Sequence, residues 1–241
     1  MRVVMWSGPR NLSTAMMRSF GARRECDVVG EPFYAAFLAA SGLAHPMREE
    51  VLASQPADPA EVAAACAAPA PSGRIRYEKH MTHHMLPGFG LEWMAGARVA
   101  FLIRDPREVA ASYAAKREAF DLADLGFERQ AEIHAQATRM LGAPPPVVDA
   151  ADIRRAPEAT LRALCAALGL PFDPARLSWP AGRRAADGVW AAHWYGAVER
   201  STGFAPPDPR PPAPLDPRIA RMIAPAMEIH RALASAKVGG D

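Results

Sequence analysis

The residues from Val3 to Thr14 combine types that bind anions. An apolar stretch leads into a tight turn, and two hydroxyl side chains stand where a helix is expected to begin. The first backbone N–H groups of a helix lack intrahelical acceptors and lie at the positive end of its dipole, so they favour phosphate. We interpret this turn as a phosphate-binding loop formed by Gly8, Pro9, Arg10, Asn11, Leu12, Ser13 and Thr14. The alternative is an ordinary turn in which Ser13 only caps the helix.

A second polar segment follows the apolar run that ends at Ile103. Arg104 comes directly after this run, and Asp105 and Pro106 have the types that begin a helix, which then carries Ser112. In a parallel sheet Arg104 emerges at the same edge as the first turn, so its guanidinium and the Ser112 hydroxyl are expected to hold a second phosphate. The alternative is that Arg104 pairs with Asp105 or with a carboxylate of the helix.

Two places offer a general base. Glu31 follows the apolar run 27–30, and Pro32 keeps the backbone extended beside aromatic residues, an apolar flank that favours a raised carboxyl pKa. The alternative is a surface glutamate that caps the next helix. The second place is the segment 77–84, which ends a third apolar run and contains Lys79, His80, His83 and His84. If a helical turn begins here, His80 and His84 are expected to point the same way.

The histidine cluster also raises the question of a metal. No cysteine or carboxylate stands at a spacing typical of zinc sites nearby, and a loop cluster of this kind more often lines a polar cleft. We therefore expect no metal.

Short apolar runs alternate with longer alanine-rich segments of helical period, which predicts an α/β fold with a three-layer arrangement, a parallel sheet flanked by helices. The expected strands are Val3–Trp6, Asp27–Gly30, Arg74–Glu78, Arg98–Ile103 and Pro146–Asp149. We expect one domain over residues 1–241, with a proline-rich strap at 204–217 and a C-terminal helix at 217–236 packed on it.

Composition limits the function classes. The chain has 28 Lys and Arg against 26 Asp and Glu, and a net charge of +2 is too small to indicate nucleic acid or a membrane surface as a partner. Its three cysteines form no CxxC pair and are typical of free thiols in a reducing compartment. The N-terminus reaches Gly8-Pro9 too soon for a signal peptide, so a cytoplasmic location is expected.

Taken together, the two phosphate-binding segments resemble the PAPS-dependent sulfotransferase family, which has a P-loop-like nucleotide-binding fold. In that family a Pro-Lys-Ser-Gly-Thr-Thr loop follows the first strand, and residues 9–14 match it with Arg10 in place of the lysine. A strand-end arginine with a serine eight places later matches Arg104 and Ser112. The pair Arg183 and Arg184 is similar, with a displaced glycine, to a C-terminal segment that closes over the nucleotide.

The resemblance implies a sulfotransferase that uses PAPS as co-substrate, releases 3′,5′-bisphosphoadenosine and needs no metal. The loop would bind the 5′-phosphosulfate, with Arg10 neutralising the leaving phosphate, and Arg104 and Ser112 would bind the 3′-phosphate. Lys79 matches a family lysine, but Met81 stands where cytosolic members have a histidine base, whereas Glu31 resembles the glutamate of some bacterial members. The base is therefore one of Glu31, His80 or His84.

Two other functions remain open from the sequence. A P-loop kinase or NTPase acting with Mg-ATP would use Asp105 as a metal-binding carboxylate, although the Gly-Lys-Ser/Thr of the Walker pattern is missing. A catalytically degenerate nucleotide-binding module is the other. The sequence predicts a small-molecule acceptor bearing a hydroxyl or an amine, and indicates neither which acceptor nor the oligomeric state.

Overall fold

A computed structural model describes residues 1–115, 117, 119–208 and 214–239. Its centre is a five-stranded sheet, and every pairing in it is parallel. The strands are β1 (Arg2–Ser7), β2 (Cys26–Gly30), β3 (Ile75–Met81), β4 (Arg98–Ile103) and β5 (Val147–Asp149), in the order β2-β3-β1-β4-β5. The predicted α/β fold class is confirmed.

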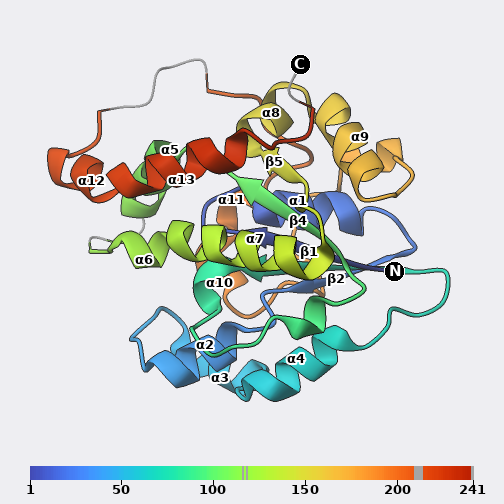
Figure 1. Ribbon diagram of the computed structural model, residues 1–241, viewed down its shortest axis with the longest axis horizontal. Coiled ribbons are helices and arrows are strands. Elements are labelled where there is room, and N and C mark those ends of the chain that lie inside the picture. The colour runs from blue at the N-terminus through green and yellow to red at the C-terminus, as the bar shows by residue number, and fades with distance from the viewer. Residues whose placement is uncertain (116, 118, 209–213, 240–241) are drawn as a thin grey trace.

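Helices cover both faces of the sheet (Figure 1). They are α1 (Ser13–Gly21), α2 (Tyr34–Ser41), α3 (Arg48–Ser54), α4 (Pro59–Ala67), α5 (Pro106–Ala114), α6 (Leu122–Leu125), α7 (Phe127–Leu141), α8 (Ala150–Arg155), α9 (Pro157–Ala167), α10 (Ala191–Trp194), α11 (Gly196–Glu199), α12 (Pro217–Met222) and α13 (Ala224–Ala234). Three-residue or four-residue 3-10 helices lie at Thr82–His84, Glu92–Met94 and Pro174–Leu177.

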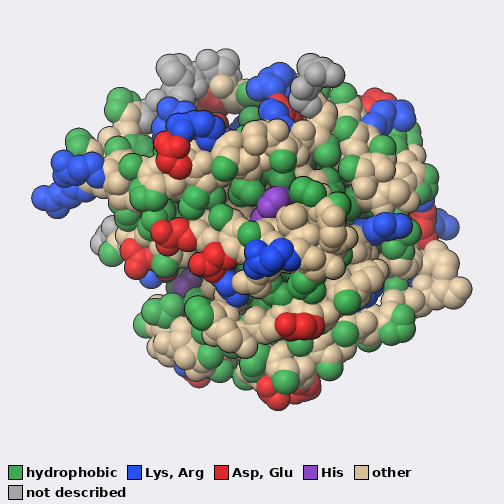
Figure 2. All heavy atoms as spheres, viewed as in Figure 1, with side chains coloured by type: hydrophobic (Ala, Val, Ile, Leu, Met, Phe, Trp, Pro, Cys, Tyr) green, Lys and Arg blue, Asp and Glu red, His purple; other side chains and the backbone are tan. Residues whose placement is uncertain are grey.

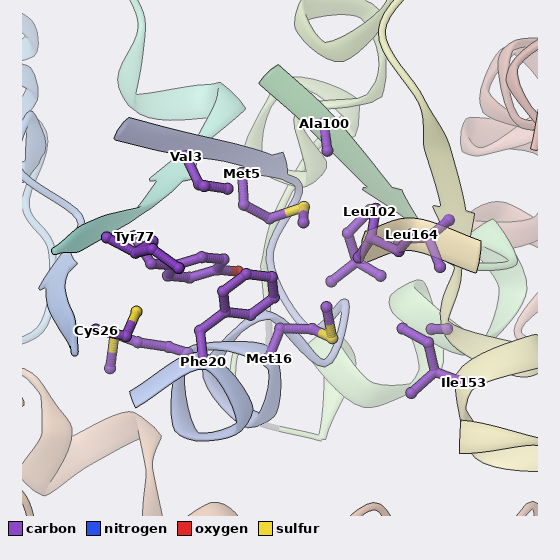
Figure 3. Packing of buried hydrophobic residues seen from close by; sticks show 14 of the residues in the cluster. Val3, Met5, Met16, Phe20, Cys26, Tyr77, Ala100, Leu102, Ile153 and Leu164 are labelled. Atoms are coloured by element: carbon purple, nitrogen blue, oxygen red, sulfur yellow. The ribbon is translucent and has the colours of Figure 1, made fainter. Parts of the chain in front are cut away.

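The alternation of side chains along β1 builds two cores. Val3 and Met5 face the side covered by α1 and α9, whereas Val4 and Trp6 face the side covered by α4, α7 and α13. Figure 3 shows the first core, where Phe20 of α1 lies against Tyr77 of β3 with ring centroids 4.3 Å apart. Both faces of the sheet are therefore buried, as parallel sheets require.

Two elements differ from the sequence-based expectation. The third strand was expected to end at Glu78 and continues instead to Met81, because its pairing with β1 extends to Ser7. The C-terminal helix is divided at Ile223 into α12 and α13. Pro225, in the first turn of α13, has no N–H to donate and crowds the preceding turn, which ends a continuous helix there. Residues 209–213 of the expected strap lie outside the described residues.

Candidate functional site

A cavity of about 340 Å³ lies at the carboxyl ends of the strands. β1 is flanked by β3 on one side and β4 on the other, so the chain reverses its direction of strand addition at β1. In open α/β sheets the crevice at such a reversal is the usual ligand site. The walls of the cavity include residues from the carboxyl ends of the strands or from the segments after them, among them Arg10, Glu31, Lys79, Arg104 and Arg154.

The turn after β1 has the backbone shape of an anion-binding loop. Arg10 and Leu12 both have positive φ, 61° and 64°, and such turns aim successive N–H groups into one concavity. Helix α1 begins at Ser13 with Leu12 as its N-cap and no side-chain cap, so Ser13 does not play the capping role considered above. Gly8 is required because a Cβ there would stand 2.7 Å from the carbonyl oxygen of Leu125.

The two arginines expected to bind separate phosphates meet at this loop. Nη1 of Arg104 donates to the main-chain oxygen of Arg10 at 2.6 Å, and Nε of Arg10 donates to Oγ of Ser112 at 2.9 Å. Arg104 also pairs with Glu108 of α5 at 2.8 Å. It therefore forms the ion pair of the alternative interpretation and also lines the cavity. Ser112 is not part of the cavity wall and instead orients Arg10.

Arg10 carries a charge that no carboxylate of the described residues neutralises. Among the described residues it forms an ion pair with no carboxylate. Burial, and then the neighbouring charge of Arg104, lower the pKa of Arg10. Two adjacent guanidinium groups in a partly buried cavity repel each other, and an anionic ligand removes that repulsion. The electrostatics at this end of the cavity therefore favour a phosphate or sulfate group.

A buried cluster of three residues lines the part of the cavity next to β2 and β3, which the sheet order places on the other side of β1 from Arg104. Glu31 is 7% exposed and its Oε1 accepts from Nζ of Lys79 and, at 3.1 Å, from Oη of Tyr195. That tyrosine oxygen in turn accepts from Lys79 at 3.1 Å and from Nε1 of Trp190 at 3.1 Å. α2 begins at Tyr34 without a side-chain cap, so Glu31 is not the helix cap of the alternative interpretation.

The cluster keeps its lysine charged. Burial of Lys79 opposes the charge, but the Glu31 carboxylate and the Tyr195 hydroxyl outweigh it and raise the pKa of Lys79 to about 12. Glu31 itself adopts φ 50°, a conformation that costs free energy in a non-glycine residue. Its main chain is held by the N–H bond to the oxygen of Lys79 and by Gln55, which donates to its carbonyl. The carboxylate is thus fixed at the cavity wall.

His80 lies on the opposite face of the sheet from this cluster. Because β3 continues to Met81, Lys79 and Met81 reach the cavity while His80 points into the second core, 4.8 Å from the ring of Trp6. The expectation that His80 and His84 point the same way is not met, since the helical turn begins only at Thr82. His84 and His83 do line the cavity, and His84 stacks on Tyr34 at 4.3 Å.

Behind the sheet, His80 joins a buried polar cluster that the chain spacing did not indicate. The side-chain atoms of Cys66, Glu78 and His80 that could bind a metal ion lie within 4.8 Å of one another. Arg76 pairs with Glu78 at 2.7 Å, and both Arg76 and Arg2 donate to the main-chain oxygen of Cys66. Burial, reinforced by Glu78, raises the pKa of the Cys66 thiol to about 12. The protonated thiol and the two guanidinium groups disfavour a cation, so ion pairing accounts for this cluster.

The arginine pair near the C-terminus does not reach the cavity. Arg183 is 59% exposed and lies 3.8 Å from Glu199, and Arg184 donates to the main-chain oxygen of Pro180. Arg154, which the sequence analysis did not single out, lines the cavity instead. It lies near the end of α8 and not directly after β5, so the strand-end argument does not identify it.

Further side chains that the sequence analysis did not assign to the site form its aromatic lining: Tyr34, His45, Tyr113, Trp194 and Tyr195. Oη of Tyr34 and Nδ1 of His45 are 2.6 Å apart, and the ring of His45 lies 5.8 Å from that of Trp194. Asp105, the carboxylate that a kinase would need, caps α5 and pairs with Arg107 outside the cavity wall. The geometry gives no support to a metal-binding role for Asp105.

The buried histidines predict a dependence of stability on pH. Burial lowers the pKa of His83 and His84 well below 6.5, so below that pH the unfolded chain binds protons that the folded chain does not. The free energy of unfolding should be greatest above pH 6.5 and fall as the pH drops from there toward the folded pKa values. Each group contributes up to about 1.4 kcal/mol per pH unit.

Urea unfolding at about pH 7.5 and about pH 5.5 measures this loss. His84→Gln should lose less stability between the two pH values than the wild type, with His193→Gln, at an exposed position, as the matched control. Equal losses in the wild type and in His84→Gln would contradict the assignment.

The surface and the helices add two observations. On the face in Figure 2, basic and acidic side chains are interspersed and the basic ones do not gather in one patch. None of the helices in the described ranges is long and apolar enough to cross a membrane.

Comparison with known proteins identifies related sequences and folds. A family model described as "Sulfotransferase domain" matches residues 1–236. Branched-chain-amino-acid aminotransferase-like protein 1 of Arabidopsis thaliana is 39% identical over 206 residues, which are 86% of this chain and 37% of that protein. The chain therefore spans little more than a third of the length of this relative, and the relative's name describes a much longer protein.

Two solved structures share the fold. The sulfotransferase domain from the olefin synthase of Synechococcus PCC 7002 superposes with a TM-score of 0.61 at 17% identity, covering 97% of this chain and 94% of that one. The sulfotransferase domain from the curacin biosynthetic pathway gives a TM-score of 0.54 at 16% identity, covering 92% and 96%. Both are similar in fold over nearly the whole chain.

Proposed function

The chain belongs to the sulfotransferase family, and we propose that it transfers a sulfuryl group from PAPS to a hydroxyl or amine of a small-molecule acceptor. The observation that carries this proposal is a single cavity lined by the loop after β1, where Arg10 has no carboxylate partner among the described residues, and, toward β2 and β3, by the buried Glu31–Lys79 pair. In-line transfer needs these two functions on opposite sides of the sulfur.

The cationic end fits the nucleotide. The N–H groups at the start of α1, the hydroxyls of Ser13 and Thr14 and the guanidinium of Arg10 would hold the 5′-phosphosulfate. Arg104 would bind the 3′-phosphate, with Ser112 keeping Arg10 in position. As the bond between sulfur and the bridging oxygen breaks, negative charge moves onto the 5′-phosphate, and Arg10 stabilises it. The product that leaves is 3′,5′-bisphosphoadenosine.

The other end fits the acceptor. Its oxygen or nitrogen forms the new bond to sulfur, and its proton passes to the carboxylate of Glu31. Burial holds the pKa of His84 well below the ordinary histidine value, which makes its imidazole a weak base. Nδ1 of His84 is buried without a hydrogen-bond partner among the described residues, and we assign it the role of orienting the acceptor. His80 has no part in this proposal, because it lies behind the sheet.

Calorimetric titration tests the proposed function. The wild-type protein should bind 3′,5′-bisphosphoadenosine equally well with and without Mg²⁺, and Arg104→Ala should bind it at least about tenfold more weakly, since a charge-assisted hydrogen bond is lost. A preference for Mg-ATP would contradict the proposal and indicate a kinase or NTPase. Nucleotide binding without sulfuryl transfer from PAPS to any member of a panel of phenols, alcohols and amines would indicate a binding module.

The proposal extends to organisation and location. We propose that residues 1–241 act as one domain and that the protein works in the cytoplasm. Three free cysteines, all buried, support a reducing compartment: Cys26, Cys66 and Cys165.

A further inference from the structure

Arg154 lines the cavity from the helix after β5, the strand next to β4 and its Arg104, in a place that the family resemblance does not assign. It belongs to α8, which follows β5 directly, and it lines the cavity together with Gly203, Phe204 and Ala205. Its Nε donates to the main-chain oxygen of Ala205 at 3.2 Å and its Nη2 to that of Pro206 at 2.8 Å. The guanidinium is therefore held in a defined orientation against the segment 203–206.

In the described part of the chain, the charge of Arg154 has no carboxylate partner, and its Nη1 donates to no acceptor. The neighbouring arginine shows the contrast, because Arg155 pairs with Asp152 at 2.7 Å. Nζ of Lys237 pairs with the second oxygen of the Asp152 carboxylate at 2.6 Å. The nearby carboxylate is thus occupied, and the free donors and the charge of Arg154 remain for a ligand.

The distribution of charge along the cavity indicates which ligand group this is. Arg10, Arg104 and Arg154 line it, whereas Glu31 stands with Lys79 in an internal ion pair. A nucleotide with anionic groups at two separate positions needs cations at both. Arg183 and Arg184, which the family resemblance would place over the nucleotide, lie outside the cavity wall and supply neither cation.

We propose that Arg154 is a specificity-determining residue that donates to the 3′-phosphate of the nucleotide alongside Arg104, so that the protein distinguishes 3′,5′-bisphosphoadenosine from 5′-AMP. This rests on the proposed function. Because two main-chain oxygens already orient the guanidinium, little side-chain entropy is lost when its remaining donors bind the phosphate. The same contacts tie the segment 203–206, part of the cavity wall, to α8.

The test compares the affinities of these two nucleotides by calorimetry in the wild type, Arg154→Ala, Arg154→Lys and the matched control Arg155→Ala. The ratio of the two dissociation constants reports the 3′-phosphate alone. We expect this ratio to fall about tenfold or more in Arg154→Ala, as expected for a lost charge-assisted hydrogen bond. It should be partly retained in Arg154→Lys, which keeps the charge, and unchanged in Arg155→Ala.

If Arg154 has a purely structural role, Arg154→Ala should weaken the binding of both nucleotides equally. The ratio of the dissociation constants would then be unchanged, which would overturn this inference. If the wild type binds the bisphosphate no better than 5′-AMP, the proposed use of PAPS fails as well. If the wild type discriminates and Arg154→Ala discriminates equally, only the role of Arg154 is wrong. Arg154→Lys keeps the comparison available should Arg154→Ala fail to fold.

Discussion

Glu31→Gln should lower turnover by about 10²-fold to 10⁴-fold, the range that a positioned general base contributes, and leave the affinity for 3′,5′-bisphosphoadenosine unchanged. The substitution keeps the shape of the side chain and removes the proton acceptor at the acceptor end of the cavity. The nucleotide is expected at the opposite end, at the loop and Arg104, so its binding should not respond. Rates of transfer from radiolabelled PAPS to a panel of phenols, alcohols and amines measure the first effect, and calorimetry measures the second.

Controls separate catalysis from folding. Glu49→Gln, at a side chain that is 85% exposed, is the matched substitution outside the cavity. Because Glu31→Gln leaves the buried ammonium of Lys79 without its carboxylate, it should also destabilise the fold. A double variant, Glu31→Gln with Lys79→Met, removes that unpaired charge and should recover stability without recovering turnover. If Glu31→Gln retains turnover while His84→Gln loses it, the base is the imidazole and not the carboxylate.

Arg10→Ala should lower turnover by about 10²-fold to 10³-fold, by analogy with the removal of other groups that stabilise developing charge. Arg10 is the only cation within the turn at residues 8–14, and it pairs with no carboxylate in the described chain. Its charge is therefore available to the leaving phosphate, where negative charge grows as the sulfuryl group departs. Single-turnover rates with saturating PAPS isolate this step from nucleotide binding.

Two substitutions make the Arg10 prediction specific. Arg10→Lys places the lysine of the resembling family loop at this position, keeps the positive charge and should retain much of the single-turnover rate. Arg107→Ala removes an exposed guanidinium that pairs with Asp105 outside the cavity wall, and should leave the rate unchanged. A rate in Arg10→Ala equal to that of Arg107→Ala would show that the leaving phosphate is stabilised by other groups.

Local patterns in the sequence were sufficient for the parallel sheet and for the approximate positions of its strands. Buried parallel strands are short apolar runs, and their carboxyl ends share one edge of the sheet. The sequence alone therefore predicts Arg10, Glu31, Lys79 and Arg104 at one edge. Arg154 lies within α8 and not directly after the fifth strand, so the position of a strand end does not indicate it.

Tertiary structure decided which of the candidate side chains face the cavity. A strand that continues three residues further than expected turns His80 to the other face, because the side-chain period of a strand is two. Tyr195 reaches Glu31 across 164 residues of chain, and the cluster behind the sheet joins Cys66 to Glu78 and His80. No local pattern records such contacts, since they depend on how segments distant in the sequence pack. The sequence therefore determined the binding edge of the sheet, and long-range packing selected the residues that act there.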